Sequence, residues 1–205
     1  MAWDGAVTAA YDLGGDLDAA PLTSQVFGAV NDLSGARDVV VCAAGSMTGD
    51  LHKMWRTNDA KGYQVEYGYS CMVTRSPGGS GSRWHLPTVR SSSMVGGGSY
   101  RMMAQEPVTA TQEGIKLVVV IVWNHGFTSI GKLFETVGAS HLGTGNRYCG
   151  PGGRLDRDIL SIDLAANAAS LGAQAIRADT LGSSGSAWPR LWRRQAPRWS
   201  TSNAS

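Results

Sequence analysis

The sequence has few cysteines, and their spacing excludes two classes of protein. Its 205 residues include only three, Cys42, Cys71 and Cys149, which lie far apart and form no CxxC pair. Disulfide frameworks need more cysteines and structural zinc sites need closely spaced ones, so we expect neither. This usage is consistent with a reducing compartment, and we expect a cytoplasmic protein.

The sequence also lacks the patterns of a signal peptide and of a membrane-spanning segment. The start, MAWD, has no basic region followed by an apolar stretch, so we expect no signal peptide. The longest apolar run, 117–123, is far too short to cross a bilayer. The formal net charge is +2, but arginines cluster after residue 189 and the rest of the chain is slightly acidic. We therefore expect neither membrane insertion nor general nucleic-acid binding.

The apolar residues that are present alternate between helical and strand-like patterns. Helical spacing predicts helices over 24–33, 101–113 and 162–171, with a kink or late start at Pro107 in the second. Short runs rich in β-branched residues predict strands over 38–44, 117–123 and 175–178. This alternation indicates a single α/β domain, with a doubly wound parallel sheet and helices on both faces.

Glycine-rich or polar turns follow the predicted strands. Residues 45–50 and 124–127 come directly after strand ends, where ligands bind in sheets of this kind. A third turn, Gly96-Gly97-Gly98-Ser99, precedes a predicted helix. Its backbone N–H groups could cradle a phosphate, although a loop of this type taken alone is more often a flexible turn.

The wider pattern favours the phosphate cradle. The segment GGGSY, followed by a helix, a strand and NHGF, resembles the signature of thiamine-diphosphate enzymes, which is Gly-Asp-Gly and then a later Asn. Further segments resemble one subfamily, the 3D-(3,5/4)-trihydroxycyclohexane-1,2-dione hydrolases of myo-inositol catabolism. They are AAGSMTGDLHKMW (43–55), EYGYSCM (66–72), QEGIKL (112–117) and DLAANA (163–168). The resemblance extends from about residue 20 to about residue 180.

The resemblance implies a set of cofactor-binding residues. Thiamine diphosphate would lie against Gly45, Ser46, Met47, Tyr69, Ser70, Met72, Gly96, Gly97, Gly98, Ser99, Asn124, His125, Gly126 and Phe127. Met72 would lie near the thiazolium, although plain core packing explains a methionine there equally well. The Asn124 side chain and the Gly126 carbonyl would hold Mg²⁺, which prefers such hard oxygen ligands.

Two features of the family's catalytic site are missing from this sequence. Gly97 stands where the family has its metal-binding Asp, which should weaken binding of Mg²⁺ and of the diphosphate. The glutamate that activates the cofactor belongs to a separate pyrimidine-binding domain, usually donated across a dimer interface. We therefore assign no catalytic residue, and we expect a truncated fragment that is inactive alone. Its partners would be that domain, a second copy, and a small cyclic trihydroxy-dione as substrate.

Two stretches do not follow the family. Residues 73–93 have neither helical nor strand periodicity, and a frameshift within a family-like Tyr-Glu-Ile-Ala gives Thr74-Arg75-Ser76-Pro77. We interpret this stretch as out of frame. We interpret the Trp- and Arg-rich residues 182–205 as disordered or out of frame, rather than as a membrane or nucleic-acid patch. The expected organisation is a lead-in over 1–19, the cofactor domain over 20–181, and this tail.

Two other functions are compatible with the same residues. A lyase or synthase of the acetolactate synthase type would share the superfamily motifs, although segment 46–53 and the NHGF segment favour the hydrolase. A non-catalytic remnant or assembly module is favoured by the missing Asp and the missing domain.

Overall fold

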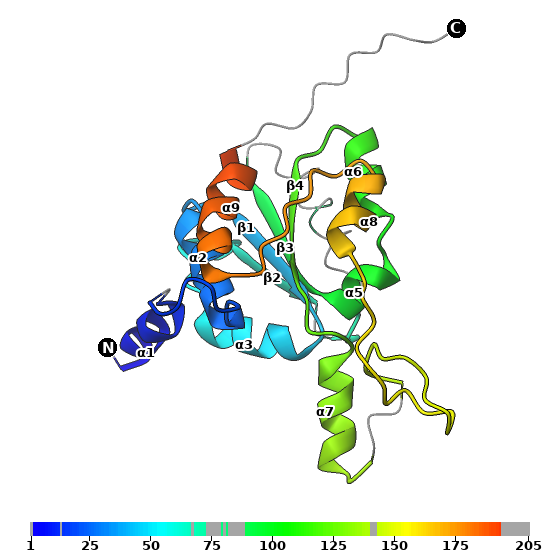
Figure 1. Cartoon of the computed structure of the whole chain (residues 1–205). Coiled ribbons are helices and arrows are strands. Elements are labelled where there is room, and N and C mark those ends of the chain that lie inside the picture. The colour runs from blue at the N-terminus through cyan, green and yellow to red at the C-terminus, as the bar shows by residue number, and fades with distance from the viewer. Residues whose placement is uncertain are drawn as a thin grey trace, which may run out of the picture.

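A computed structural model describes residues 2–12, 14–66, 68–72, 79, 81, 89–139 and 143–193. Its strands are β1 (Val39–Ala43), β2 (Tyr63–Glu66), β3 (Ser91–Gly96) and β4 (Leu117–Val122). Its helices are α1 (Ala2–Tyr11), α2 (Thr23–Leu33), α3 (Ser46–Met54), α5 (Gly97–Met102), α6 (Glu106–Gln112), α7 (Thr128–Thr136), α8 (Leu164–Ser170) and α9 (Leu181–Arg193). Figure 1 shows the strands at the centre of the chain, with helices around them.

The strands form one parallel sheet in the order β2-β1-β3-β4. The chain passes from β1 to β2 on one side of β1, and then crosses to β3 and β4 on the other side. The sheet is therefore doubly wound, and its switch point lies between β1 and β3. In such sheets the crevice beyond the carboxyl ends at the switch point is the usual ligand site. The expected α/β fold is therefore confirmed, and it places the ends of β1 and β3 side by side.

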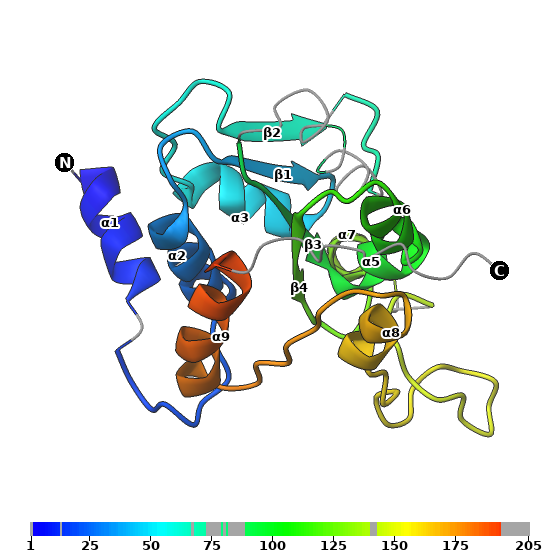
Figure 2. The same ribbon diagram turned by 90° about the horizontal axis from the view of Figure 1, so that it is seen from above.

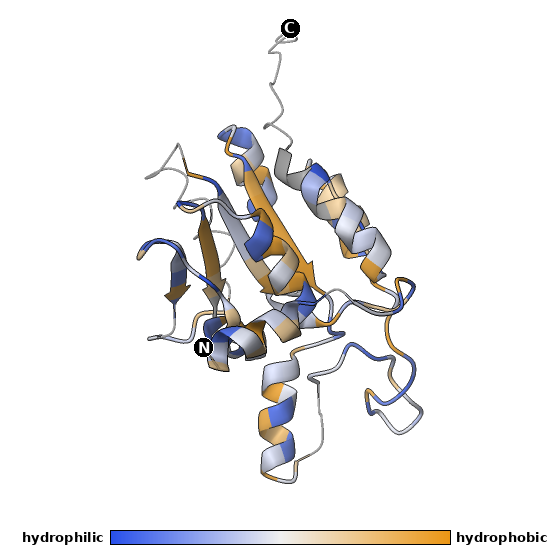
Figure 3. Cartoon of the chain, turned by 90° about the vertical axis from the view of Figure 1, so that its left-hand side faces the viewer, coloured by the Kyte–Doolittle hydropathy of each residue, from blue (hydrophilic) through white to orange (hydrophobic). Residues whose placement is uncertain are grey.

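Two apolar clusters cover the two faces of the sheet, because neighbouring residues of a strand point to opposite sides. Met94 and Val120 pack with Phe27, Val30 and Leu51 of α2 and α3. The next residue in β3, Val95, packs on the other face against α5 and α8, through Tyr100, Leu164 and Ala168. Figure 2 shows α1, α2, α3 and α9 on one side of β3 and β4, and α5, α6 and α8 on the other. In Figure 3 apolar colour is concentrated in the strands, whereas the helices are mixed.

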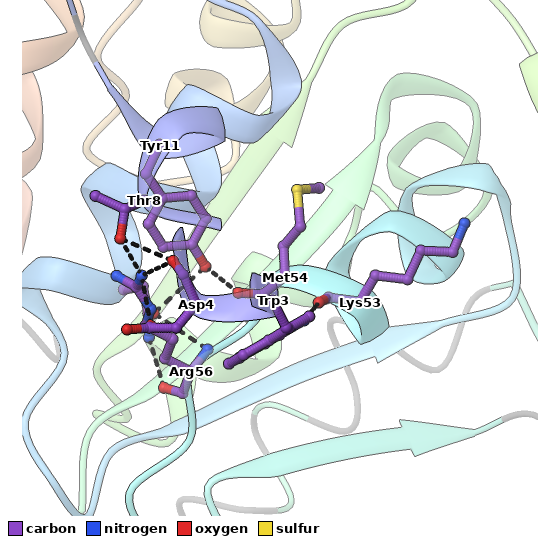
Figure 4. A network of polar contacts seen from close by, with 8 residues as sticks. Trp3, Asp4, Thr8, Tyr11, Lys53, Met54 and Arg56 are labelled. Carbon is purple, nitrogen blue, oxygen red and sulfur yellow. Dashed lines mark hydrogen bonds and ion pairs between the residues drawn. The ribbon is translucent and has the colours of Figure 1, made fainter. Parts of the chain in front are cut away.

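Polar contacts dock α1 onto the rest of the fold (Figure 4). The Arg56 guanidinium forms an ion pair with Asp4 at 2.9 Å and donates a hydrogen bond to Thr8 Oγ1 at 2.6 Å. It also lies 5.3 Å from the centre of the Tyr11 ring. The Tyr11 hydroxyl donates a hydrogen bond to the Met54 carbonyl, and Trp3 Nε1 donates one to the Lys53 carbonyl at 2.7 Å. The lead-in helix is thereby fixed to the carboxyl end of α3.

Several secondary-structure predictions are confirmed, with small shifts of boundary. The predicted helices over 24–33 and 162–171 correspond to α2 and α8, and the predicted strands over 38–44 and 117–123 correspond to β1 and β4. The predicted helix over 101–113 is divided into α5 and α6. Pro107 lies in the first turn of α6, where its missing N–H costs no hydrogen bond, so the late start is the correct alternative.

Two predictions fail where local sequence is ambiguous. Residues 175–178 do not form a strand in the described part of the chain; a four-residue segment that contains one arginine is equally compatible with an extended connection. Residues 181–193 form α9, where the sequence indicated an irregular tail. The reason is a helical stripe of Leu181, Ser184 and Ala187, all buried, and a reciprocal cap between Thr180 and Ser183.

The irregular stretch 73–93 ends in a strand. Its last residues, Ser91, Ser92 and Ser93, open β3 and are 2%, 2% and 0% exposed. The expectation of no regular structure is therefore wrong for these residues, which pair with β1 and β4 on both sides. Of the rest of this stretch, only residues 79, 81, 89 and 90 belong to the described chain, and the tail beyond residue 193 also lies outside it.

Candidate cofactor-binding site

Three loops meet at the carboxyl edge of the sheet, and each leads directly into a helix. Gly45 connects β1 to α3, Gly96 is followed at once by α5, and residues 124–127 connect β4 to α7. The loops enclose a pocket of about 30 Å³ at the switch point. It is lined by Gly45, Ser46, Met47, Met72, Gly96, Gly98, Ser99, Asn124, Gly126, Phe127, Thr128 and Ser129.

The pocket brings together most of the residues that the sequence predicted for cofactor binding. Tyr69, Ser70, Gly97 and His125 are the predicted residues that do not line it. Tyr69 is 92% exposed, and Ser70 and His125 are also exposed. Thr128 and Ser129 line the pocket but were not among the predicted residues. Two hydroxyl residues directly after the NHGF segment are typical of a helix start and could have indicated them.

The pocket has the character of an anion site. The residues that line it include Ser46, Ser99, Thr128 and Ser129, which carry hydroxyl groups, and none with a charged side chain. The amino-terminal ends of α3 and α7, each nine residues long, open onto it. Helix amino termini carry partial positive charge and unpaired N–H groups, which attract phosphate oxygens.

Close backbone approach explains two of the glycines. A β-carbon on Gly98 would lie 2.8 Å from Phe127 Cδ1 and 3.0 Å from the Gly126 carbonyl oxygen. A β-carbon on Gly126 would overlap the Thr144 carbonyl oxygen. A side chain at Gly98 would therefore push α5 away from the loop after β4, and one at Gly126 would push that loop away from residues 144–145. His125, the residue before Gly126, has φ of 59°, a left-handed conformation that non-glycine residues rarely adopt.

A neighbouring segment holds the 124–127 loop in place. Phe127 N donates to the Thr144 carbonyl at 2.7 Å, and Asn146 N donates to the His125 carbonyl at 2.8 Å. Arg101 of α5 donates from Nη2 to Asn146 Oδ1 at 2.8 Å. The same guanidinium lies 5.8 Å from the centre of the Phe127 ring. Arg101 thus connects α5 to Phe127 and to the segment that holds the 124–127 loop.

Glu66, at the end of β2, shapes the loop that carries Met72. Its carboxylate accepts hydrogen bonds from Tyr69 N at 2.8 Å and Cys71 N at 2.7 Å. These bonds, first from Tyr69 and then from Cys71, hold the pKa of the Glu66 carboxyl below its usual value. Ser70 between them has φ of 55°. The turn brings Met72 to the pocket and leaves Tyr69 pointing into solvent.

The residues present fit a diphosphate better than they fit a metal ion. Asn124 and Gly126 both line the pocket, as the resemblance implied, but both offer neutral oxygens only. Among the described residues, no three His, Cys, Asp or Glu side chains gather where they could hold a metal ion. A β-carbon on Gly97 would overlap Trp123. The carboxylate that Mg²⁺ favours is therefore missing from this site.

A larger cavity of about 830 Å³ runs along β4, and its lining also includes residues of α6 and α8 and residues 172–179. Its lining includes the side chains of Leu117, Val119 and Ile121 and is mainly apolar. We assign cofactor binding to the smaller pocket because the helix amino termini and the hydroxyl residues converge there.

In the part of the chain that the structure describes, no helix is long and apolar enough to span a membrane.

A parallel, doubly wound sheet with an anion pocket at its switch point defines a cofactor-binding α/β domain. Within that class, the chain belongs to the family described as thiamine pyrophosphate enzyme, C-terminal TPP binding domain, which it matches over residues 43–190.

The chain is similar to several proteins named as hydrolases. It is 39% identical over 159 residues to a 3D-(3,5/4)-trihydroxycyclohexane-1,2-dione hydrolase of Bacillus thuringiensis (strain Al Hakam), covering 77% of this chain and 25% of the relative. A second hydrolase of this name, from Bacillus cereus (strain ZK / E33L), is 39% identical over 155 residues, which cover 75% and 24%. This chain thus spans about a quarter of the length of these relatives.

Among solved structures, the fold is similar to benzoylformate decarboxylase from Polynucleobacter necessarius. The TM-score is 0.67 at 17% sequence identity, over 87% of this chain and 32% of the decarboxylase. At this identity the likeness concerns the fold, which is the α/β fold expected from the sequence.

Proposed function

We propose that this chain binds thiamine diphosphate at the pocket between β1, β3 and β4. The single observation that carries the proposal is the convergence of three strand-to-helix loops on a pocket with hydroxyl groups and no acidic side chain. The diphosphate would accept hydrogen bonds from Ser46, Ser99, Thr128 and Ser129 and from the N–H groups of the loops. Met72 would pack against the thiazolium, and Tyr69, Ser70 and His125 would contact the cofactor from the pocket rim.

We further propose that the domain serves a hydrolase that opens a cyclic trihydroxy-dione by cleaving a carbon–carbon bond. The support is its 39% identity to enzymes named as such hydrolases. When bound, thiamine diphosphate supplies a carbanion that adds to a ketone and stores the electrons of the broken bond. The residues of this chain would bind and orient the diphosphate end of the cofactor.

The pocket alone covers only a small part of such a cofactor. Its volume is about 30 Å³, whereas cofactor pockets usually measure about 300–1,000 Å³. A pyrimidine-binding domain, from the same enzyme or from a dimer partner, would cover the remainder. The helix that leaves the pocket, α7, supports this arrangement because it exposes apolar side chains at Ile130, Leu133 and Phe134, and Val137 directly after it is exposed as well.

Binding of Mg²⁺ through Asn124 and the Gly126 carbonyl is the weakest part of the proposed site, because both ligands are neutral. We also propose that residues 20–181 form the cofactor domain, with residues 1–19 as its lead-in, and that the protein acts in the cytosol.

Calorimetric titration of the purified chain tests the central proposal. Thiamine diphosphate should bind, and thiamine, which lacks the diphosphate, should bind at least tenfold more weakly. Ser46→Ala combined with Thr128→Val should weaken binding of the diphosphate form, while circular dichroism stays unchanged. Equal affinity for the two ligands, or no binding of either, would contradict the proposal. A ring-opening assay of the chain, alone and with a pyrimidine-binding domain, tests the hydrolase assignment.

A second candidate function is a non-catalytic remnant that keeps the fold. Gly97 in place of a metal-binding carboxylate favours it. Binding of thiamine diphosphate without ring-opening activity, even with a pyrimidine-binding domain present, would support this candidate.

A further inference from the structure

The indole of Trp123 lies against the backbone of Gly97, the first residue of α5. A β-carbon built on Gly97 would overlap Cε3 and Cζ3 of that ring and lie 3.3 Å from its Cδ2. Gly97 has no left-handed backbone conformation, unlike several other glycines of this chain. The indole therefore requires glycine at position 97 because of space, and backbone geometry imposes no such requirement.

The neighbours of Trp123 hold the indole where it lies. Trp123 packs on the cluster formed by Val95, Tyr100, Leu164 and Ala168. Its ring also meets the His125 ring edge-on, with centroids 5.1 Å apart. Moving the indole away from Gly97 would disturb both contacts, and a rigid two-ring side chain has few alternative rotamers within a packed cluster.

We infer that the Trp123 indole fills the space that any side chain at position 97 would need. The segment from Gly96 to Gly98, whose two end residues line the pocket, therefore cannot carry a carboxylate at position 97 while the indole is present, and Trp123 is the residue that determines this. The inference deepens the proposed function and rests on it for its chemistry. It has a specific consequence: replacing Gly97 with aspartate does not by itself create the missing ligand. The aspartate becomes a ligand only when Trp123 is made smaller as well.

A double-mutant cycle of stability tests the packing claim without any cofactor. The proteins are wild type, Gly97→Ala, Trp123→Val and the double variant, compared by urea unfolding. Gly97→Ala should raise the unfolding constant roughly tenfold in the wild-type background, as overpacking does. It should have little effect beside Trp123→Val. The control is Gly49→Ala in α3, where a β-carbon has nothing within 4 Å, and no loss is expected there. Equal effects of Gly97→Ala in both backgrounds would overturn the inference.

Manganese binding, followed by electron paramagnetic resonance with inorganic pyrophosphate as the anion, tests the consequence. Gly97→Asp with Trp123→Val should bind Mn²⁺ at least tenfold more tightly than wild type or Gly97→Asp alone. Gly97→Asn with Trp123→Val, which has the same shape without the charge, should show no such gain. Tight binding by Gly97→Asp alone, or no gain in the double variant, would overturn the inference. Failure of thiamine diphosphate to bind any variant, with coupling intact in the unfolding cycle, would refute the proposed function and leave the packing claim standing.

Discussion

Arg101 of α5 and Asn146 join two parts of the candidate site through a hydrogen bond of 2.8 Å from Nη2 to Oδ1. Asn146 is 8% exposed, and its backbone N–H donates to the carbonyl of His125. The bond therefore links α5, which begins directly after β3, to the segment that holds the loop after β4 through its backbone.

Replacing Arg101 with methionine should loosen the site. The variant removes a charge-assisted hydrogen bond worth about 1.5–3 kcal/mol and leaves the side-chain carbonyl of Asn146 without this donor. We expect lower stability by about that amount and weaker thiamine diphosphate binding, measured by urea unfolding and calorimetry. Arg154→Met, at an exposed position, is the control. Unchanged stability together with unchanged affinity would show that the bond does not support the site.

Replacing Glu66 with glutamine should release the loop that carries Met72. The carboxylate accepts two backbone N–H groups, and its pKa is lowered by them. A lowered pKa means that the stabilisation is present above the unfolded-state value and is lost as pH falls through the folded-state value. The protection factors of the Tyr69 and Cys71 amides, which are corrected for the intrinsic pH dependence of exchange, should therefore fall in acid for wild type, and should already be low at neutral pH for Glu66→Gln. Glu113→Gln should leave both amides unaffected; slow exchange in Glu66→Gln would contradict this role.

Stability should fall in strong alkali because of Tyr11. Burial raises the pKa of Tyr11 to about 12, and the nearby Arg56 charge lowers it by less. A raised pKa gives stability that is complete below the unfolded-state value, about 10, and lost as pH rises through 12. Tyr11→Phe should flatten this loss, at a cost of about 1 kcal/mol at neutral pH for the bond to the Met54 carbonyl. Urea unfolding across this pH range measures it, with Tyr148→Phe as the exposed control. An equally steep fall in the free energy of unfolding of Tyr11→Phe would mean that another group causes the alkaline destabilisation.

Ser91→Ala should stabilise the protein. Ser91 lies in β3, is 2% exposed, and its hydroxyl has no hydrogen-bond partner among the described residues. A buried, unpaired hydroxyl costs about 1–3 kcal/mol, so its removal should raise the free energy of unfolding by roughly 1 kcal/mol. Thermal unfolding of Ser91→Ala, beside the exposed Ser161→Ala, measures the difference. A lower midpoint for Ser91→Ala alone would mean that the hydroxyl is bonded.

Local patterns were sufficient to predict two of the described strands, β1 and β4, and the loops that follow them, whereas β2 and β3 were not predicted. Val39–Ala43 and Leu117–Val122 are unbroken apolar runs, and the turns that follow them contain the polar residues of the site. Gly45 and Asn124 could therefore be placed at one edge before the structure was known. Gly98 was assigned to the site only by the resemblance to thiamine-diphosphate enzymes.

Contacts between distant segments could not be predicted in the same way. The overlap of Trp123 with a side chain at position 97 depends on how two loops cross, which neither segment encodes alone. The helix α9 depends on burial of Leu181, Ser184 and Ala187 beside α2, which outweighs the glycines and Pro189 within it. Tertiary packing of this kind overrides local propensity.

The most direct test of the central claim is a phosphorus NMR spectrum of thiamine diphosphate with the purified chain in EDTA. A diphosphate held by the loops of β1, β3 and β4 predicts that both phosphorus resonances shift or broaden with wild type and with Gly49→Ala. They should stay unchanged with Gly98→Val, because a side chain at Gly98 would push against Phe127 and the Gly126 carbonyl. Phosphorus resonances that stay unchanged with the wild-type chain, or that shift or broaden equally with Gly98→Val, would contradict the assignment of this pocket.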